Sequence, residues 1–510
     1  MRPLTVLLSS TGLVACLAAG GSCERPAAVQ VPLPPGTRVG WYVTIDGSSN
    51  GNGTNARPWD LQTALGGGNG QVHPGDTIWL RAGTYAGAFH SELTGTAAAA
   101  IVVRQYPGER AVLDGRGATS STSRGDMVIV NGSYAVFRDF EIMDSDPSRT
   151  LDTRPNLMVA HGSHLKFINL IVHDGGIGFY TYPEQTDIEI YGCLIYNNGW
   201  QQPDFGNGHG IYAKSSAGPV YLRDNIVFNQ FGYGIHIYAN AGSGGVNNIH
   251  VEGNVSFNNG AVDADPANSP NANILYGGGD PASGGSIVDN MTFFSPNVGV
   301  QNVTIGYSST ANVDLTAQSN YAVGGQTVFD LGFWQSLTMT GNSAFGSASS
   351  PVNLRDATTS GFQLNGNSYY RDPTAQAWLY NGGSYTFSGW QQATGVGATD
   401  QAQAAMPTQP RVFVRPNQYE AGRANVIIYN WSGQATVPVN LSGTTLAPSD
   451  AFEVRNVQDL FGGSVLSGVY DGSPVNFPMT AVTAVQPIGG APSAPPRTGP
   501  AFNVFVVLRR

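Results

Sequence analysis

The sequence is poor in charge and above all in lysine. Charged residues make up 11% of the chain, against about 25% in an ordinary soluble domain. Only two lysines, Lys166 and Lys214, stand beside 22 arginines, and the formal net charge is −10. Nucleic-acid binding needs clustered basic side chains that neutralise phosphates. The composition therefore argues against a nucleic-acid partner, and an acidic polymer has to be met by a local cationic site.

Cysteine is equally scarce, with three in the chain: Cys16, Cys23 and Cys193. The first two lie in the N-terminal segment, so only Cys193 is left as a clearly mature thiol after processing. A disulfide framework is then excluded, and the fold must be stabilised by packing.

A run long enough to span a membrane, about 20 residues, is missing from the N-terminus. Arg2 is followed by a shorter apolar run from Leu4 to Ala15, the pattern of a secretory signal, and we expect residues 1–23 to be a signal peptide. Leu13-Val14-Ala15-Cys16 resembles the lipobox of bacterial lipoproteins; Cys23 is a second candidate for lipidation, and ordinary cleavage is the alternative. We expect a secreted or cell-surface (outer-membrane lipoprotein) bacterial protein, whose only membrane contact is a lipid anchor.

Glycine, by contrast, is abundant, at 67 positions, and the chain carries an internal repeat. Alternating apolar residues, a Gly or Asp, an Asn and a second apolar strand recur, as in IEIYGCLIYNN, VYLRDNIVFNQ and IHVEGNVSFNN. The repeats align at intervals of 22 to 36 residues on Asp139, Asn169, Cys193, Asn225, Asn254, Asn290, Asn320, Asn342 and Asn367.

This repeat predicts an all-β fold, a right-handed single-stranded parallel β-helix of about nine or more coils. Each coil pairs its short strands with the coils above and below, and the aligned Asn side chains hydrogen-bond up the stack in a tight turn. Cys193 is then a small buried residue at an Asn position. An up-and-down barrel needs hairpin signals at a spacing of about 8 to 12 residues, and a propeller needs strands in groups of four.

The start of the repeat region carries a resemblance to known proteins. WYVTIDGSSNGNGTNARPWDLQTAL supplies a strand, a loop and a short helix beginning near Pro58, and HPGDTIWLRAGTY supplies the first coils. The helix is expected to cap the open end of the core. These segments and the coil repeat resemble secreted β-helix proteins of the pectate-lyase-like superfamily, including polysaccharide lyases of the chondroitinase-B and alginate-lyase kind, over about residues 41 to 370.

The resemblance implies the fold more than one reaction, because the superfamily also contains glycoside hydrolases, epimerases and non-catalytic adhesins. It also implies Ca²⁺ as a cofactor to be tested. The Asp cluster that binds calcium in pectate lyases is not recognisable in this sequence, so the metal ligands stay unassigned.

After Asn367 the repeat stops. The expected organisation is a β-helix with an N-terminal helical cap over residues 41–395, a polar linker over 396–409 and a small β-sandwich domain over 410–510. The last region contains RANVIIYNW, AFEVRNV and FNVFVVLRR, which are typical of strands between turns. We expect this domain to cap or stabilise the β-helix, with carbohydrate binding as the alternative, and we expect a monomer.

Three successive coils place ring-bearing side chains on the outside. Gly176–Tyr182 stacks on Gly208–Lys214, which stacks on Gly232–Tyr238. Alternation then points six side chains outward: Tyr180, Tyr182, Tyr212, Lys214, His236 and Tyr238. With coils about 4.8 Å apart, they form one patch the size of one or two sugar rings, and rings with hydroxyl groups suit a sugar-binding cleft. Aromatic residues also favour strands for structural reasons, but one of the two lysines falls among them.

The six positions contain no carboxylate. Glycoside hydrolysis by the usual route needs two carboxylates that flank the scissile bond. Candidates lie only in adjoining turns, at Asp174, Glu184 and Asp204, and further on at Asp263 and Asp265. Hydrolysis by turn carboxylates is therefore the alternative prediction, and non-catalytic glycan binding at the cell surface is a third.

β-Elimination at a uronic acid residue uses side chains that are present. It needs a base for the C5 proton, a group that protonates the departing O4, and a cation or donors for the carboxylate. We predict His236 or Lys214 as the base, Tyr212 or Tyr238 as the proton donor, and the remaining cation as the carboxylate ligand. The predicted substrate-binding residues are Tyr180, Tyr182, His209, Asp174, Glu184 and Asp204. The sequence thus predicts a polysaccharide lyase acting on a polysaccharide, acidic in this interpretation.

Overall fold

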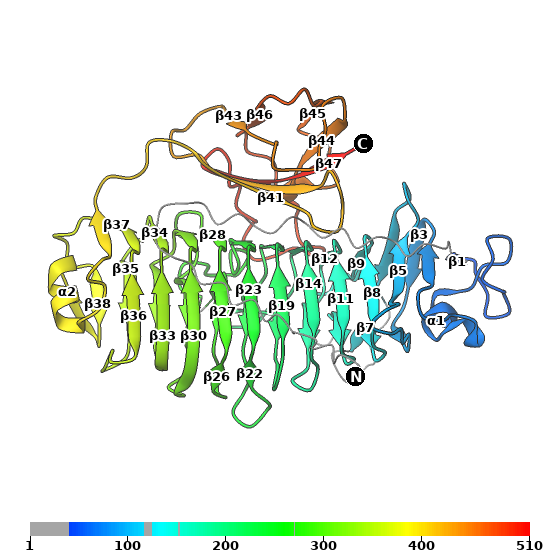
Figure 1. Ribbon diagram of the computed structural model, residues 1–510, viewed down its shortest axis with the longest axis horizontal. Coiled ribbons are helices and arrows are strands. Elements are labelled where there is room, and N and C mark those ends of the chain that lie inside the picture. Colours follow the sequence, from blue (N-terminus) through cyan, green and yellow to red (C-terminus); the bar gives the residue numbers. More distant parts are fainter. Residues whose placement is uncertain (1–39, 117–124, 151–152, 270) are drawn as a thin grey trace, which may run out of the picture.

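The computed structural model describes residues 40–116, 125–150, 153–269 and 271–510. The chain winds into an elongated right-handed parallel β-helix, and a second β unit lies along one side of it (Figure 1). The predicted fold class is confirmed. The predicted signal peptide, residues 1–23, lies outside the described residues. None of the helices in the described part of the chain has the length and apolar character that a membrane span requires.

Each coil contributes one strand to each of three 12-stranded sheets. Sheet 1 consists of β1 (Gly40–Val43), β2 (Thr77–Leu80), β5 (Ile101–Gln105), β8 (Ala135–Arg138), β11 (Leu165–Ile168), β14 (Ile188–Tyr191), β19 (Val220–Arg223), β23 (Ile249–Glu252), β27 (Gly285–Val288), β30 (Asn312–Gln318), β33 (Trp334–Thr340) and β36 (Phe362–Asn365).

Sheet 2 consists of β3 (Gly83–Ala86), β6 (Ala111–Asp114), β9 (Glu141–Met143), β12 (Ile171–His173), β15 (Leu194–Tyr196), β20 (Ile226–Phe228), β24 (Val255–Phe257), β28 (Met291–Phe293), β31 (Tyr321–Val323), β34 (Ser343–Phe345), β37 (Ser368–Tyr370) and β40 (Gln401–Gln403). The last of these strands falls inside the segment 396–409 that the sequence suggested as a linker, so the stack extends into that segment.

Sheet 3 consists of β4 (Phe89–Ser91), β7 (Asp126–Val130), β10 (Asn156–Ala160), β13 (Ile177–Thr181), β18 (Ile211–Ala213), β21 (Ile235–Ile237), β25 (Ile274–Tyr276), β29 (Gln301–Ile305), β32 (Thr327–Leu331), β35 (Ser350–Leu354), β38 (Trp378–Tyr380) and β39 (Gly383–Tyr385). Its strands pair in parallel apart from β39, which turns back on β38. Two short pairs decorate the coils: β16 (Trp200–Gln201) with β17 (Gly206–Asn207), and β22 (Val246–Asn247) with β26 (Ala282–Ser283).

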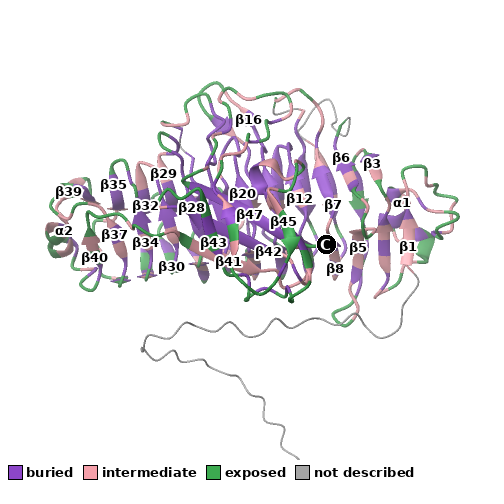
Figure 2. Ribbon diagram, turned by 90° about the horizontal axis from the view of Figure 1, so that it is seen from above, coloured by how far each residue is buried: buried purple, intermediate pink, exposed green. Residues whose placement is uncertain are grey.

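Period-2 alternation fills the core. In β19, Val220 and Leu222 are fully buried, whereas Tyr221 and Arg223 are half-buried on the outside. The inward-facing residues of successive coils join into one apolar core along the stack. In Figure 2 buried stretches alternate with half-buried ones along many of these strands.

An asparagine ladder ties the coils together between sheets 1 and 2. Asn225 N and Asn254 N each donate to the Oδ1 of the ladder residue one coil further on, Asn254 and Asn290, both at 3.0 Å. The ladder continues through Asn320, Asn342 and Asn367 to Asp400. Each side chain thus satisfies a buried backbone donor of its neighbour.

The alignment of the repeats placed two residues in the ladder wrongly, by one position. Asp139 and Asn169 have φ values of 65° and 53°, and the register places them beside Gly192 rather than Cys193. They occupy the left-handed turn position that precedes the ladder, because Asn and Asp tolerate that conformation. A second ladder, which the repeat alignment did not reveal, runs along Asn198, Gln230, Asn259, Asn273 and Asn302.

Helices close both ends of the stack (Figure 1). Helix α1 (Leu61–Leu65) begins after Asp60, whose carboxylate accepts from Thr63 N at 2.8 Å. Helix α2 (Phe387–Thr394) begins after Thr386 and buries Trp390 at the far end. The 3₁₀ turns η1 (Gly68–Gly70) and η2 (Val457–Asp459) complete the helical structure of the described residues.

The C-terminal unit contains two antiparallel sheets. The larger comprises β41 (Arg411–Pro416), β42 (Ala424–Tyr429), β44 (Ala451–Asn456), β45 (Leu466–Val469) and β47 (Phe502–Arg509), and the smaller comprises β43 (Thr436–Val439) and β46 (Val475–Pro478). Val426, Val437 and Phe477 belong to the apolar cluster that joins them. Tyr429 and Phe502, in turn, pack into a cluster with the outer side chains of sheet 2. The unit is therefore anchored on sheet 2, while the predicted patch lies on sheet 3.

Candidate active site

Sheet 3 brings the predicted side chains together. The register of β13, β18 and β21 pairs Tyr180 with Tyr212, and Tyr212 with His236, as the sequence predicted. Their neighbours along the strands point into the core and are buried. We use the name aromatic patch for the six outward residues Tyr180, Tyr182, Tyr212, Lys214, His236 and Tyr238.

The rings of the patch contact one another across the coils. The ring centroids of Tyr180 and Tyr212 lie 5.1 Å apart, and those of Tyr212 and His236 lie 4.9 Å apart. Tyr238 stacks on His236 at 5.0 Å with 18° between the planes. Edge-to-face and offset contacts of this kind are favourable, so each ring helps to fix the next. The result is a preformed aromatic surface.

Lys214 is held among these rings. Its backbone N donates to Thr181 Oγ1 at 3.0 Å, and that hydroxyl donates to Lys214 O at 2.9 Å. Its Nζ lies 5.1 Å from the Tyr212 ring centroid and 5.5 Å from that of Tyr180, within the range of cation–π attraction. In the described part of the chain no carboxylate lies within ion-pairing distance of this ammonium group. Lys214 is 8% exposed, and its charge has no carboxylate partner among the described residues.

His236 is held in the neutral form. Its side chain is 8% exposed, and Nδ1 has no hydrogen-bond partner among the described residues. Burial, followed by the nearby His209 and Lys214, holds the pKa of His236 well below its ordinary value. The imidazole is therefore uncharged at neutral pH and can accept a proton.

His209, predicted as a substrate-binding residue, supports His236 from the previous coil. Its Nδ1 accepts a hydrogen bond from Tyr233 N at 3.3 Å. The centroids of the two imidazole rings lie 4.2 Å apart. His209 is 8% exposed, and its contacts with Tyr233 and His236 place it in the floor of the patch.

Two tyrosines that sequence reasoning missed extend the patch. Tyr233 stacks on His236 with centroids 4.6 Å apart and 9° between the planes. Tyr307, 46% exposed, makes an edge-on contact with Tyr238 at 5.8 Å. Burial and the nearby Tyr307 raise the pKa values of Tyr233 and Tyr238, so both phenols stay protonated. Extending the sequence alignment of the coils by two, to the segment Ile305-Gly306-Tyr307, would have revealed Tyr307.

The predicted turn carboxylates do not gather at the patch as a pair. Glu184 and Asp204 are exposed, the first on the turn after β13 and the second in the β16–β17 hairpin. Asp174 is buried, where its carboxylate accepts from His173 at 2.8 Å and from Ile488 N at 2.8 Å. Asp263 is also buried and accepts from Gln201 Nε2 at 3.0 Å. The two buried carboxylates are thus occupied by internal partners.

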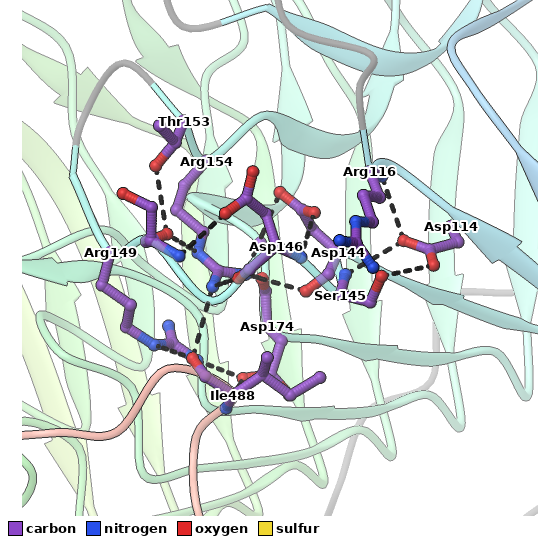
Figure 3. Close-up of polar contacts among 12 residues, drawn as sticks. Asp114, Arg116, Asp144, Ser145, Asp146, Arg149, Thr153, Arg154, Asp174 and Ile488 are labelled. Atoms are coloured by element: carbon purple, nitrogen blue, oxygen red, sulfur yellow. Dashed lines mark hydrogen bonds and ion pairs between the residues drawn. The ribbon is translucent and has the colours of Figure 1, made fainter.

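The buried acidic turn around Asp174 is filled by arginine (Figure 3). Arg154 is fully buried, and its guanidinium donates to Asp144 O at 2.8 Å, Ser148 O at 2.9 Å and Asp174 O at 2.5 Å. It also donates to the carbonyls of Asp146 and Ile488. Burial lowers the pKa of Arg154, and the ring of carbonyl oxygens compensates the lost hydration.

Arg149 occupies the neighbouring position in the same turn (Figure 3). It forms an ion pair with the Asp174 carboxylate and donates to Gly199 O at 2.8 Å and Ile488 O at 2.7 Å. Burial lowers the pKa of Arg149 to about 10, against the opposing effect of Asp174, so the group remains charged. The two arginines join three coils to the C-terminal segment at Ile488.

These residues do not fit a calcium ion. Calcium takes six to eight oxygen ligands, about 2.3–2.6 Å from the ion, and the carbonyl oxygens of this turn already surround Arg154. Among the described residues no group of three or more His, Cys, Asp or Glu side chains is arranged to hold a metal. The positive charge in this turn is therefore supplied by the side chains of Arg154 and Arg149.

The fold and the patch define a right-handed parallel β-helix protein with a candidate sugar-binding face on sheet 3. Residues 41–342 match the family described as Pel9A-like, right handed beta helix region, and the chain belongs to this family.

Two relatives and one solved structure illustrate the similarity. The chain is 26% identical over 351 residues to pectate lyase PEL9 of Emericella nidulans, covering 62% of this chain and 80% of that protein. It is 23% identical over 297 residues to pectate lyase L of Thermoclostridium stercorarium, covering 55% of this chain and 22% of that protein. The crystal structure of pectate lyase Pel9A matches with a TM-score of 0.51 and 17% identity, over 66% of this chain and 80% of that one. At this identity the structural likeness concerns the fold.

Proposed function

We propose that the protein is a polysaccharide lyase that cleaves a uronate-containing polysaccharide by β-elimination at the aromatic patch. The observation that carries the proposal is the ammonium group of Lys214, which has no carboxylate partner among the described residues and lies among tyrosine rings beside a neutral His236. Two relatives named as pectate lyases support the same reaction class.

In this proposal Lys214 binds the uronate carboxylate. A cation at this position withdraws electron density from the carboxylate, lowers the barrier to removal of the C5 proton and stabilises the negative charge that develops. The rings of Tyr180 and Tyr212 offer flat apolar surfaces to the adjoining sugars.

His236 is then the base and Tyr238 the acid. The neutral imidazole takes the proton from C5, the C–H electron pair forms the C4=C5 double bond, and the C4–O4 bond breaks with its electrons on oxygen. The raised pKa of Tyr238 keeps this phenol protonated, so it can deliver a proton to the departing O4. Arrival of the substrate carboxylate raises the basicity of His236, because a nearby negative charge favours the imidazolium.

Hydrolysis is the less favoured reaction. Asp174 and Asp263 have internal partners, and the patch itself presents no carboxylate. Incubating the purified chain with a panel of uronate and neutral polysaccharides separates the classes. Ultraviolet absorbance of the new double bond supports elimination; new reducing ends without that absorbance would show a hydrolase. Retained binding without either product would show a glycan-binding protein.

We also propose that the protein acts as a monomer outside the cytoplasm, secreted or held by a lipid on Cys16 or Cys23. The apolar run from Leu4 to Ala15 supports export. Cell fractionation followed by mass spectrometry of the mature N-terminus tests this: an unprocessed Met1 in the cytoplasm would contradict it.

A further inference from the structure

The C-terminal segment that meets the two buried arginines comprises residues 485–493, between β46 and β47. It lies along the turns that join sheet 2 to sheet 3. Ile488 N donates to the Asp174 carboxylate at 2.8 Å, and Val485 O accepts a hydrogen bond from Asn197 Nδ2 at 3.2 Å. Asp174 and Asn197 belong to successive coils, so the segment is fixed to the β-helix at more than one coil.

Gly489 brings this segment into close contact with the turn that carries Arg149. Its φ is 83°, and a Cβ at this position would lie 1.9 Å from Pro147 O. Gly490 has nearly the same φ, 82°, but a Cβ there would meet no other part of the described chain within 4 Å. The segment can approach the turn so closely because position 489 carries no side chain.

Arg149 joins the C-terminal segment to the turns of two further coils (Figure 3). Its Nε donates to Ile488 O at 2.7 Å, while Nη1 donates to Asn197 O at 3.1 Å and to Gly199 O at 2.8 Å. Its Cζ lies 4.7 Å from the ring centroid of Phe231, one coil beyond Gly199, within the range of cation–π attraction. The side chain is 8% exposed, so one buried guanidinium group contacts all of these elements.

Gly199 and Phe231 pack against the backbone that carries the floor of the patch. A Cβ on Gly208 would lie 2.4 Å from Gly199 Cα, so the residue before His209 rests directly on Gly199. A Cβ on Gly199 would in turn lie 2.7 Å from Phe231 Cβ, and Phe231 precedes Tyr233 by two residues. A shift of either contact of Arg149 therefore moves the backbone next to the floor.

The floor residues hold His236 on one side. Tyr233 N donates to His209 Nδ1 at 3.3 Å, and the rings of Tyr233 and His209 lie 4.6 Å and 4.2 Å from that of His236, centroid to centroid. On the following coil the partner of His236 in the register is the uncharged Leu275. The titratable side chains around His236 in the described chain are His209, Tyr212, Lys214, Tyr233 and Tyr238.

We propose, building on the lyase function above, that the C-terminal segment supports the site through Arg149, which acts as a positioning residue for the aromatic patch. The planar guanidinium group spans Ile488 O, Gly199 O and the Asp174 carboxylate at once. The segment, the turn and the floor thus keep one geometry, and His236 stays buried against its neighbours. A lysine ammonium carries the same charge but lacks this fork of donors.

Two Arg→Lys variants of the full chain test the role of Arg149. Arg149→Lys keeps a charge beside Asp174 but loosens the floor, and water then stabilises the imidazolium of His236. We expect the pH midpoint of the His236 titration, followed by NMR of histidine-labelled protein, to rise by at least about half a pH unit. Arg154→Lys is the control, because Arg154 bonds the turn and Ile488 O, and should leave the midpoint unchanged. No rise in Arg149→Lys, or an equal rise in both, would overturn the proposal.

Two Gly→Ala variants test it from the other side of the contact. Gly489→Ala collides with Pro147 O and displaces the segment from Arg149, whereas Gly490→Ala introduces the same left-handed strain without a collision. We expect the His236 midpoint to rise in Gly489→Ala and to keep its wild-type value in Gly490→Ala. Equal midpoints in these two variants would overturn the proposal, and this test holds even where an arginine variant does not fold.

The positioning role and the lyase proposal fail in different ways. The His236 titration needs no substrate, so a raised midpoint supports the role of Arg149 even if no polysaccharide gives double-bond absorbance. If the chain is a lyase, Arg149→Lys should also lower kcat/KM by about tenfold, because the base is misplaced. Product formation at the wild-type rate together with an unchanged midpoint would overturn the positioning role and leave the lyase proposal standing.

Discussion

The imidazole rings of His209 and His236 lie 4.2 Å apart, centroid to centroid, on adjacent coils of sheet 3. Two imidazolium ions so close would repel each other, and Lys214 adds a further positive charge. This arrangement, with burial, keeps the pKa of His236 well below its ordinary value of 6.5. A base in this environment is ready at neutral pH without losing a proton first.

The first prediction is a pH profile. Because a lowered pKa leaves the neutral form populated at all pH values above it, kcat/KM should be level from neutral to mildly alkaline pH and fall only in acid, below pH 6.5. Initial rates of double-bond formation across the pH range measure this. A rate that climbs steadily towards about pH 10, where a free lysine loses its proton, would instead make Lys214 the base and His236 a supporting residue.

The second prediction compares the only two lysines. Lys214→Ala should lower kcat/KM by at least about 100-fold, because the carboxylate loses its cation in the transition state. Lys166 pairs with Glu189 at 2.8 Å on sheet 1, so Lys166→Ala should keep nearly full activity and lose about 1 kcal/mol of stability or less. Turnover and thermal unfolding of both variants are the measurements. Equal activity in the two variants would remove Lys214 from the site.

The third prediction concerns stability and pH. Burial lowers the pKa of His173, but hydrogen bonds to Asp174 and Glu141 outweigh it and raise the pKa to about 9. The unfolded chain has the ordinary value of 6.5. The stability contributed by protonated His173 is therefore fully present below pH 6.5 and is lost as the pH rises through 9. Tm should decline over this window, and His173→Asn should flatten the decline; a Tm that rises from pH 6.5 to 9 would contradict this sign.

The fourth prediction is that calcium does not stabilise this chain through the acidic turn. Asp144 Oδ2 has no hydrogen-bond partner among the described residues, but the guanidinium groups of Arg154 and Arg149 supply positive charge to the turn. A divalent ion is therefore repelled there. Thermal unfolding should give the same Tm in excess calcium and in EDTA, since a ligand that binds only the folded state raises Tm. A rise in Tm with calcium that is absent from the Asp174→Asn variant would place an ion at this turn.

The fifth prediction is the importance of Arg154 itself. Arg154→Met removes the group that five backbone carbonyls share. Ser148 O and Ile488 O keep donors from Thr153 and Arg149, whereas the carbonyls of Asp144, Asp146 and Asp174 lose the guanidinium in a buried turn. We expect a loss of roughly 3 kcal/mol or more in the free energy of unfolding, measured by denaturant titration. Arg57, an exposed residue that donates to Asn50 O at 3.0 Å, is the matched control, and Arg57→Met should cost less than about 1 kcal/mol. Similar losses of stability in both variants would contradict the role of Arg154 in joining the coils to the C-terminal segment.

Much of the fold could be predicted because a coil repeat is a local signal. Alternation in VYLRDNIVFNQ fixed which residues of β19 and β20 point inward, and the spacing of Asn225, Asn254 and Asn290 gave the ladder. The alignment failed at Asp139 and Asn169, because an Asp or Asn in the left-handed turn and an Asn in the ladder look alike in sequence. The same local reasoning stacked Tyr180, Tyr212 and His236 in register.

The sequence by itself determined the coil, the inward and outward faces, and the six residues of the aromatic patch, because period-2 alternation and repeat spacing act over a few residues. Only the tertiary structure decided what surrounds them. Arg154 meets Ile488, more than 300 residues away, and Tyr307 reaches Tyr238 across one intervening coil. The protonation of His236 is set by burial and by neighbouring charge. Both depend on contacts between coils, so they cannot be inferred from any single segment of the sequence.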